Sequence, residues 1–324
     1  PLPGSVRTTP TSGERRELVP VESRPPMVAR ALRWVSTTPS AIARSEPLLQ
    51  AVVRADPGLE LRSDEGTGAL LLAGADETHL RLAVERLDRL GAQATLELPP
   101  VGYVETPLTA VRGVEGMHRK TDGDGLVEEF GRCEVDLSPA DPGMGTRFVD
   151  QIGDIEDDLP RRYRPAIDEG ARTALKHGPT AGYRVIGVEL ALTGGDYDML
   201  QSTDDHFRMA GHRAARSALE RVGTRLLEPW WEVQVDTPQH ALGDVISDIS
   251  AHRGRILGME VVEGTTRLVA ACPYRELRTF GTRLQTLTGG RATFRGQESH
   301  YEPLPSHLVT EVIHASPYRR EATR

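Results

Sequence analysis

One order of secondary structure is predicted twice in this chain, and it restricts the possible folds more than any other feature. In residues 27–98, apolar alternation and helical periodicity predict strand, helix, strand, strand, helix and strand. The helices are expected at about 39–55 and 75–90, and Gly91 supplies the stop signal of the second. The apolar face of that second helix is predicted to consist of Leu80, Ala83, Val84, Leu87 and Leu90.

The same order recurs in residues 229–302. Helices are predicted at 239–252 and 274–287, and an Arg-Gly-Arg turn, Arg253–Arg255, leads from the first helix into an apolar strand. Two strand–helix–strand units in this order make a split βαβ fold, so both segments are expected to form ferredoxin-like domains. The adjacent Trp230 and Trp231 are expected to pack one into the core and one across the pleat, because strand side chains alternate between faces.

Residues 99–228, between the two repeats, are predicted to form an α/β domain of their own. Its helices are expected at 161–177 and 203–222, and its loops are long and acidic. Residues 1–26 are rich in Pro, Thr, Ser and Arg and predict a linker or the end of a preceding domain. In the tail, 303–324, the stretch LVTEVI predicts a closing helix.

Charge and cysteine usage exclude several classes of protein. The formal net charge of -8 excludes a globally basic nucleic-acid binder, so any RNA contact must come from local arginine-bearing surfaces. Cys133 and Cys272 are far apart in apolar segments and are expected to be buried, reduced thiols. No apolar run approaches the roughly 20 residues that span a bilayer, and no signal peptide is recognisable. We therefore expect a cytoplasmic, monomeric protein without a membrane partner.

The sequence DGDG suggests a calcium-binding loop. With Asp122 and Asp124 at loop positions 3 and 5, however, position 1 would be Lys120 and position 12 Gly131. The first carboxylate and the bidentate glutamate of an EF-hand would both be missing, which argues against a specific calcium site. Weak association of Mg²⁺ with Asp122, Asp124 or Asp198 stays open where the loops meet RNA phosphate.

The motifs of zinc enzymes and of serine hydrolases do not occur in this chain. His206 and His212 are six residues apart on a predicted helix, so they face different directions and are expected to be surface histidines. No HExxH motif and no GxSxG nucleophile elbow is present. The sequence therefore predicts no catalytic residue, no metal site and no cofactor site in this chain.

Several segments of this chain, taken in order, resemble motifs of one known family. They are GADETHLRLAVERL (74–87), PPVGYVET (99–106), LPRRYRPAIDEGARTALKHGPTAGYRV (159–185), GGDYDMLQSTDDHFRMAG (194–211), LLEPWWEVQVDTP (226–238), GDVISDISAHRGRILGME (243–260) and RTFGTRLQTLTGGRATF (278–294). Over about 27–302 the chain resembles domains three, four and five of bacterial elongation factor G, the translational GTPase that drives ribosomal translocation. The resemblance implies two ferredoxin-like domains flanking a central, ribosomal-protein-S5-like α/β domain.

The resemblance also implies that the GTPase domain is not part of this chain. No GxxxxGK[ST] phosphate loop occurs, so nothing here cradles the β and γ phosphates of a nucleotide. GTP and Mg²⁺ are implied for that missing domain, and this chain alone should not hydrolyse GTP. The first residue is Pro rather than Met, which we also interpret as a sign of a longer parent protein.

By resemblance, the fourth domain carries two tip loops that hold tRNA and mRNA at the decoding region, and the fifth rests on ribosomal RNA. The counterparts of the tip loops are 120–131 and 194–205. RNA contact needs arginines and backbone donors directed at phosphates. The candidate contact residues are Lys120, Asp122, Gly123, Asp124, Gly125, Tyr197 and Asp198 at the tip, and His252, Arg253, Arg255 and Arg291 in the fifth domain.

The tip loops depart from the family pattern in their charge. Asp122, Asp124, Glu128 and Glu129 stand where the family has arginine and neutral groups, and Asp198 stands where it has histidine. Carboxylates repel RNA phosphates at short range. We therefore expect either a translocase variant or, as the alternative, a ribosomal protection factor of the tetracycline type or a ribosome rescue factor. The tetracycline ribosomal protection proteins use the same architecture. A binding module unrelated to the ribosome is the alternative from another class.

Overall fold

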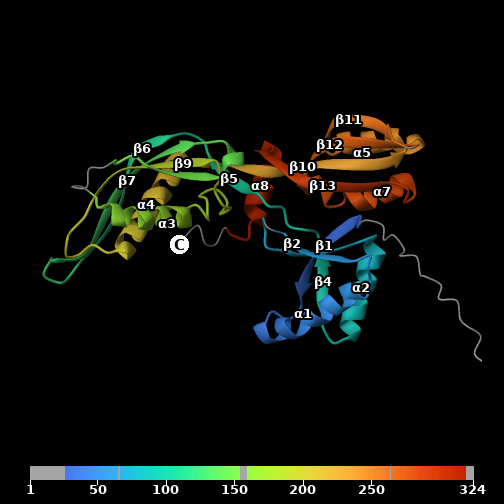
Figure 1. The fold of residues 1–324 in the computed structure, drawn as a ribbon, viewed down its shortest axis with the longest axis horizontal. Coiled ribbons are helices and arrows are strands. Elements are labelled where there is room, and N and C mark those ends of the chain that lie inside the picture. The colour runs from blue at the N-terminus through green and yellow to red at the C-terminus, as the bar shows by residue number, and fades with distance from the viewer. Residues whose placement is uncertain (1–25, 65, 154–158, 263, 319–324) are drawn as a thin grey trace, which may run out of the picture.

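The computed structural model describes residues 26–64, 66–153, 159–262 and 264–318. Within them the chain forms three sheets that belong to an elongated molecule (Figure 1). The predicted linker, 1–26, lies outside the described residues except for its last residue, and so do residues 319–324 of the tail. The mixed α+β architecture with two ferredoxin-like units around a central domain is confirmed.

The first ferredoxin-like domain follows the predicted order. Its elements are β1 (Val28–Trp34), α1 (Pro39–Arg54), β2 (Glu60–Ser63), β3 (Leu70–Gly74), α2 (Glu77–Arg89) and β4 (Ala94–Glu97). The strands lie in the antiparallel order β2-β3-β1-β4. On α2, Leu80, Ala83 and Leu87 are buried as predicted, but Leu90 is 53% exposed because it caps the helix end and leaves the apolar stripe.

The second ferredoxin-like domain has the same topology with two differences. Its elements are β10 (Thr224–Pro238), a 3-10 turn (Gln239–Ala241), α5 (Leu242–Ala251), β11 (Arg255–Val262), β12 (Thr265–Pro273), α6 (Tyr274–Leu277), α7 (Phe280–Thr288) and β13 (Thr293–Pro303). Strand β10 begins at 224, ahead of the boundary predicted at 228/229, because its first residues pair with β5 (Val104–Pro107) of the central segment.

The helix predicted at 274–287 is broken into α6 and α7. The carbonyl of Arg278, at the break, accepts a hydrogen bond from Arg30 Nη1 of the first domain (3.0 Å). Arg278 Nη1 in turn donates to the carbonyl of Pro99 (3.1 Å). Arg30 thus takes up a backbone carbonyl that a continuous helix would use, and sequence periodicity does not reveal such a partner.

The central domain is built on a long hairpin. Its elements are β6 (Val111–Thr121), β7 (Val127–Pro139), β8 (Thr146–Asp150), α3 (Arg164–Ala174), β9 (Val188–Asp196) and α4 (Asp204–Val222). The strand order is β6-β7-β9-β8, with β8 parallel to β9. Helices α3 and α4 lie against each other (Figure 1), and backbone contacts at Gly170 and Gly211 leave no room for a Cβ atom at the crossing.

Two large apolar cores and one small cluster, Val104, Ile186 and Leu227, hold these parts together. One is confined to the central domain and includes Phe207 and Ile167. The other joins both ferredoxin-like domains and α8 (Ser306–Ala315), the predicted closing helix, in one continuous cluster that contains Leu72 and Val233. The two ferredoxin-like domains therefore form one base, from which the central domain projects (Figure 1). None of the described helices is long and apolar enough to cross a membrane.

A buried carboxylate fixes the root of the central domain. Glu105 on β5 is fully buried and accepts hydrogen bonds from the backbone amides of Thr180 (3.0 Å), Ala181 (2.8 Å) and Tyr183 (3.1 Å). Its Oε2 also accepts a hydrogen bond from the Thr224 hydroxyl at the start of β10. A buried charge with several donors holds its neighbours in a defined geometry, so the projection starts from a rigid joint.

Candidate functional site

The two predicted tip loops meet at the far end of the central domain, at the left of Figure 1. One is the turn between β6 and β7, and the other follows β9. They are joined by hydrogen bonds, since the amide of Phe130 donates to the carbonyl of Gln201 (3.1 Å) and Ser202 Oγ donates to the carbonyl of Phe130 (2.8 Å). The structure thus brings the tip residues from both loops together on one end of a stiff hairpin.

Two of the tip carboxylates shape the loops. Asp122 Oδ1 accepts from the amides of Asp124 (3.0 Å) and Leu126 (2.8 Å), which closes the hairpin turn. Gly125 sits in this turn at φ +83°, a conformation that favours glycine. Asp198 Oδ1 likewise accepts from the amides of Leu200 (2.8 Å) and its neighbour Gln201 (3.1 Å). Asp122 and Asp198 therefore cap their loops, whatever else they contact.

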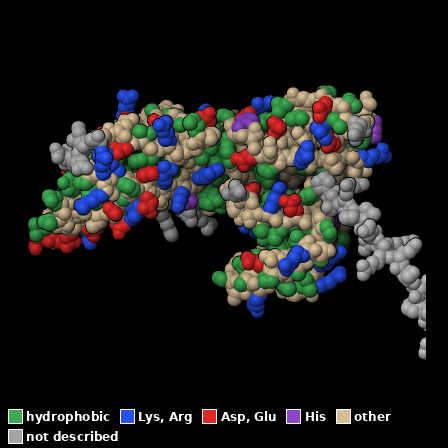
Figure 2. Space-filling model, in the orientation of Figure 1, with side chains coloured by type: hydrophobic (Ala, Val, Ile, Leu, Met, Phe, Trp, Pro, Cys, Tyr) green, Lys and Arg blue, Asp and Glu red, His purple; other side chains and the backbone are tan. Residues whose placement is uncertain are grey.

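The charged side chains of the first tip loop are mostly acidic. Lys120 lies 3.1 Å from Glu129 and 3.6 Å from Glu128, and its hydrogen bond to Glu129 raises the pKa of Lys120. Asp124 is exposed and no contact of its carboxylate with another described side chain is found. Figure 2 shows acidic side chains gathered at this end of the molecule. A phosphate that approaches the tip meets carboxylates without a free lysine beside them.

Apolar side chains are also exposed at the tip, a feature that the sequence reasoning missed. Leu126 is 69%, Met199 81% and Leu200 89% exposed. Tyr197, in contrast, is half-buried, and its ring lies 6.4 Å from that of Tyr163. Leu126, Met199 and Leu200 lie inside turns, away from any apolar periodicity. This position is the signal in the sequence that could have identified them as exposed.

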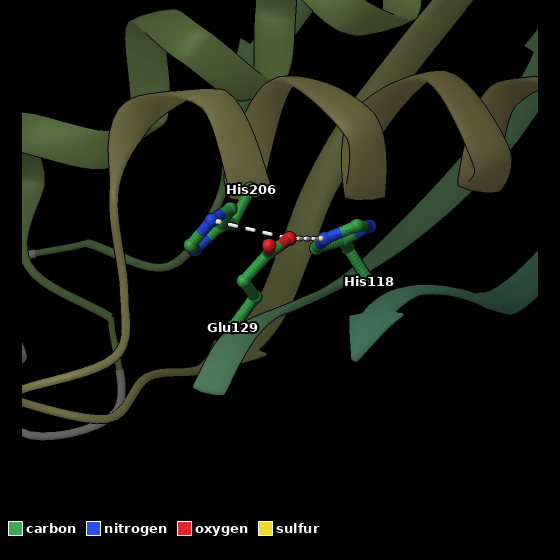
Figure 3. Close-up of side chains that lie close together, drawn as sticks. All are labelled: His118, Glu129 and His206. Atoms are coloured by element: carbon green, nitrogen blue, oxygen red, sulfur yellow. Dashed lines mark hydrogen bonds and ion pairs between the residues drawn. The ribbon is translucent and has the colours of Figure 1, made fainter. Parts of the chain in front are cut away.

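A histidine pair lies just behind the tip (Figure 3), and here the prediction of surface histidines is wrong. The side chain of His206 is only 14% exposed, and its ring stacks on that of His118 with centroids 5.2 Å apart. Glu129 lies between them, with Oε2 2.7 Å from His118 Nε2 and 3.6 Å from His206 Nε2. Hydrogen bonds from His118 and then from Lys120 lower the pKa of Glu129 to about 2.

Sequence spacing hid this cluster because the residues come from β6, β7 and α4. His212, the second histidine on α4, is half-buried, and burial followed by the charge of Arg216 lowers its pKa. The hairpin register could have placed His118 near Glu129, because Lys120 pairs directly with Glu129 and His118 precedes it by two on the same face.

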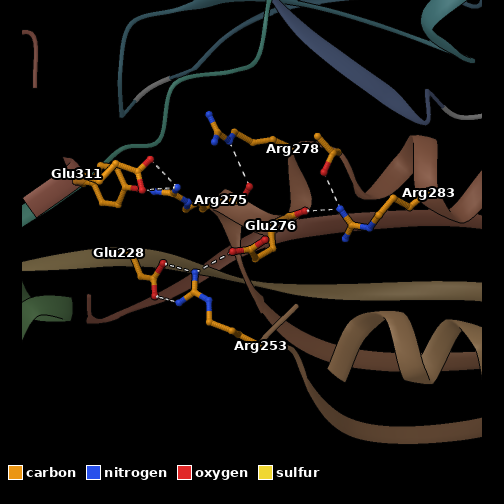
Figure 4. A network of polar contacts seen from close by, with 9 residues as sticks. Glu228, Arg253, Arg275, Glu276, Arg278, Arg283 and Glu311 are labelled. Atoms are coloured by element: carbon orange, nitrogen blue, oxygen red, sulfur yellow. Dashed lines mark hydrogen bonds and ion pairs between the residues drawn. The ribbon is translucent and has the colours of Figure 1, made fainter. Parts of the chain in front are cut away.

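In the fifth-domain turn, Arg253 points into the protein (Figure 4). Its guanidinium donates to Glu228 Oε1 (2.5 Å) and Oε2 (3.1 Å) and to Glu276 Oε1 (3.2 Å). The Glu228 side chain is 1% exposed and that of Arg253 is 25% exposed. Arg253 therefore neutralises a buried carboxylate, a role that the sequence did not suggest.

The remaining predicted contact residues of this domain lie nearer the surface. Arg255 is 57% exposed, is paired with Glu302, and stacks 4.1 Å above the Trp230 ring. His252 is half-buried and lies 3.4 Å from Asp248. Arg291 is exposed beside the glycine turn that ends α7. Of the four, Arg255 and Arg291 present their charge to solvent, and RNA contact by any of them stays a prediction.

The cysteines and tryptophans agree with their sequence predictions. Cys133 and Cys272 are free and buried, and burial raises the pKa of each to about 12. Trp230 is buried, whereas Trp231 is half-buried and stacks on Tyr274 with centroids 4.8 Å apart. These groups support the sheet and offer no reactive site.

Comparisons with known proteins identify relatives over nearly the whole described chain. Residues 26–97 match the family model described as elongation factor G, domain III, residues 99–223 match domain IV, and residues 225–312 match the elongation factor G C-terminus. The crystal structure of a protein from Thermus thermophilus is 33% identical, with a TM-score of 0.78. The match covers 90% of this chain but only 43% of the Thermus thermophilus chain.

Proposed function

This chain belongs to the elongation factor G family, and from that premise we propose that it acts as the ribosome-reaching arm of a translational GTPase. Domains III, IV and V of the family are all present and constitute a ribosome-binding portion related to translational GTPases. The finer proposal is that the central domain is directed at the decoding region and moves tRNA and mRNA. GTP and Mg²⁺ would bind to a GTPase domain joined to this chain, and the chain itself would bind neither.

The observation that carries this proposal is the arm itself. A lever must transmit force without bending, and this one has a separate packed core, a root fixed by Glu105, and two tip loops hydrogen-bonded to each other. Its base is a single core that spans both ferredoxin-like domains. Such an arrangement supports delivery of the tip to a distant target better than it supports small-molecule chemistry.

Ribosomal protection is the second candidate, favoured by the composition of the tip. Lys120 is neutralised by two glutamates, and Asp124 faces solvent among exposed apolar side chains. A tip of this kind is better suited to displacing a bound drug, or to contacting an apolar protein surface, than to binding phosphate. It uses the same base and the same arm, so the two candidates differ only in what the tip does.

Cosedimentation with 70S ribosomes over a salt series tests ribosome binding by the chain. Binding that weakens steeply with salt supports the proposal, since contacts to phosphate release counterions. No binding at low salt would favour the alternative of a non-ribosomal module. The tip is then tested in a longer protein that joins the chain to its GTPase domain: poly-Phe synthesis with GTP indicates translocation, whereas release of bound tetracycline without poly-Phe synthesis indicates protection.

A further inference from the structure

The strongest unexplained feature of the molecule is the cluster of two imidazoles and a carboxylate behind the tip. We propose that His118, Glu129 and His206 form a binding site for a divalent transition-metal ion of the zinc class, which fastens the two tip loops together. The nitrogen and oxygen atoms that could act as ligands all lie within 4.8 Å of one another. The proposal concerns a property of the chain itself and does not depend on ribosome binding.

The distances fit a tetrahedral ion after a small adjustment. With zinc–nitrogen and zinc–oxygen bonds of about 2.0–2.2 Å, neighbouring ligand atoms lie roughly 3.4 Å apart. His206 Nε2 and Glu129 Oε2 are already 3.6 Å apart. His118 Nε2 lies 2.7 Å from the same oxygen, so these two atoms must separate by about 0.7 Å, which side-chain rotation at the hairpin can supply.

The tautomer of His206 makes its Nε2 available to an ion when the ring is neutral. Its Nδ1 lies 2.9 Å from the carbonyl oxygen of Gln201, which can only accept, so Nδ1 carries the proton. In the neutral ring, Nε2 is then a bare lone pair facing the carboxylate of Glu129. Two electron-rich atoms 3.6 Å apart repel each other, and a cation between them turns that repulsion into ligation.

The hydrogen bond from His206 to Gln201 is also of the kind that metal-binding histidines make. Histidines that bind metals almost always donate their second ring proton to a carbonyl or carboxylate, which fixes the ring and its tautomer. Gln201 lies in the second tip loop, and its carbonyl also accepts the amide of Phe130 on the hairpin. An ion bound by His206 would therefore be linked, through the carbonyl of Gln201, to the hydrogen bond that joins the two loops.

The donor set selects the kind of metal. Two imidazoles and one carboxylate suit zinc and similar ions, whereas Mg²⁺ and Ca²⁺ prefer oxygen ligands only. The side chains are 11%, 14% and 30% exposed for His118, His206 and Glu129, which leaves an access route and a fourth position for water. The proposed site is thus open on one side.

The affinity should be moderate. His118 Nδ1 is buried and has no hydrogen-bond partner among the described residues. When Nε2 binds a metal, it no longer donates to Glu129 and the ring proton moves to Nδ1, so one of the two histidines lacks the outer partner that such sites normally have. Loss of an outer partner typically weakens metal binding by about 10–100-fold. We expect affinity well below that of a structural zinc site with four protein ligands.

The test uses the full chain, titrated with Zn²⁺ in competition with a chromophoric chelator, and with Co²⁺ monitored by its visible absorption. We expect one equivalent of Zn²⁺ and a tetrahedral Co²⁺ spectrum. Substitution His118→Ala or His206→Ala should weaken binding at least about tenfold. His212→Ala on the same helix is the matched control and should leave the affinity unchanged.

Three results would overturn the proposal: no saturable binding, binding that survives the double substitution of His118 and His206, or equal loss in the His212→Ala control. If His206→Ala fails to fold, as judged by circular dichroism, His206→Gln decides, because glutamine can still donate to Gln201 while it offers a poor ligand. Ribosome cosedimentation of the metal-free protein separates the two proposals. Intact ribosome binding without any metal affinity refutes the metal site alone.

Discussion

Replacement of Arg253 by methionine should destabilise the fifth domain, although the residue lies in a turn beside the surface. Methionine keeps the stem of the side chain and removes the guanidinium. Glu228, only 1% exposed, then loses the donors to both of its oxygens and is left as an uncompensated buried charge. Breaking a buried ion pair by removing one partner typically costs about 3–5 kcal/mol.

The partial exposure of Arg253 sets the size of the effect. Because its side chain is 25% exposed, water can partly solvate Glu228 in the variant, and we take the lower end, about 3 kcal/mol. The two ferredoxin-like domains share one core, and for a unit of roughly 150–250 residues each kcal/mol shifts the Tm by roughly 2–4 °C. The base should therefore melt about 6–12 °C lower than in the unsubstituted protein.

A backbone feature makes a sharper, graded prediction possible. Arg253 has φ +65°, and the turn is a Schellman motif in which Gly254 N–H donates to Ile249 O (2.8 Å) and Arg253 N–H to Ser250 O (3.3 Å). The left-handed conformation costs a non-glycine residue roughly 1–2 kcal/mol. Arg253→Gly loses the same ion pair but recovers that cost, so it should be less destabilised than Arg253→Met by about 1 kcal/mol.

The assay is urea unfolding followed by tryptophan fluorescence. Trp230 and Trp231 lie in β10 of the affected sheet, whereas Trp34 lies in β1 of the first domain. A Trp34→Phe background therefore reports the fifth domain alone. Arg255→Met in the same turn is the matched control, because its 57% exposed ion pair and its cation–π contact are together worth only about 1 kcal/mol.

Two outcomes would refute this reasoning. One is an Arg253→Met variant as stable as Arg255→Met, which would mean that burial of Glu228 does not require the guanidinium. The second is an Arg253→Gly variant less stable than Arg253→Met, which would contradict the backbone argument. A stable Arg253→Met variant with lost ribosome affinity would instead assign Arg253 to RNA contact.

Three further predictions concern the tip, the thiols and the helix crossing. Asp124→Arg should tighten binding to ribosomes about fivefold at low salt, because the change in charge contributes roughly 1 kcal/mol; filter binding measures this. Asp122→Arg is the control and should show no gain, because it also removes the cap of the turn. Cys133 and Cys272, whose pKa values are about 12, should resist iodoacetamide up to about pH 10 and react only after denaturation, as mass spectrometry would show. Gly211→Ala should destabilise the central domain by about 1–3 kcal/mol in thermal unfolding, because a Cβ there would collide with the backbone of α3, and an unchanged Tm would contradict this packing.

In the two ferredoxin-like domains, periodicity predicted the existence and order of the helices and strands, because burial of one face is a local property of the sequence. It failed where partners from another domain intervene. The break between α6 and α7 lies where the carbonyl of Arg278 accepts a hydrogen bond from Arg30, and β10 starts early because β5 pairs with its first residues. Neither partner is visible within the helical or strand window itself, so no local pattern could have indicated these changes.

The candidate site divides in the same way. The two tip loops were located by motif and do meet in the structure, where they are hydrogen-bonded to each other. The direction of single side chains was not predictable. Arg253 turns inward because its backbone is left-handed at the end of α5, and His206 meets His118 because α4 crosses the hairpin. Both depend on tertiary geometry rather than on spacing.

The carboxylates of the tip affect the stability of its loops as well as its interaction with RNA. Asp122 and Asp198 already use their carboxylates to hold the loops in shape, so they cannot be replaced by basic residues without loss of those turns. In the hairpin turn, the carboxylate that faces solvent without a partner among the described residues is that of Asp124. Any gain of RNA affinity through this tip must therefore come from positions outside the two caps, which restricts how a protein with this loop architecture could change its grip on phosphate. If the proposed metal ion binds behind the tip, it adds positive charge without disturbing either cap, and metal loading should then reduce the repulsion of phosphate that the carboxylates cause.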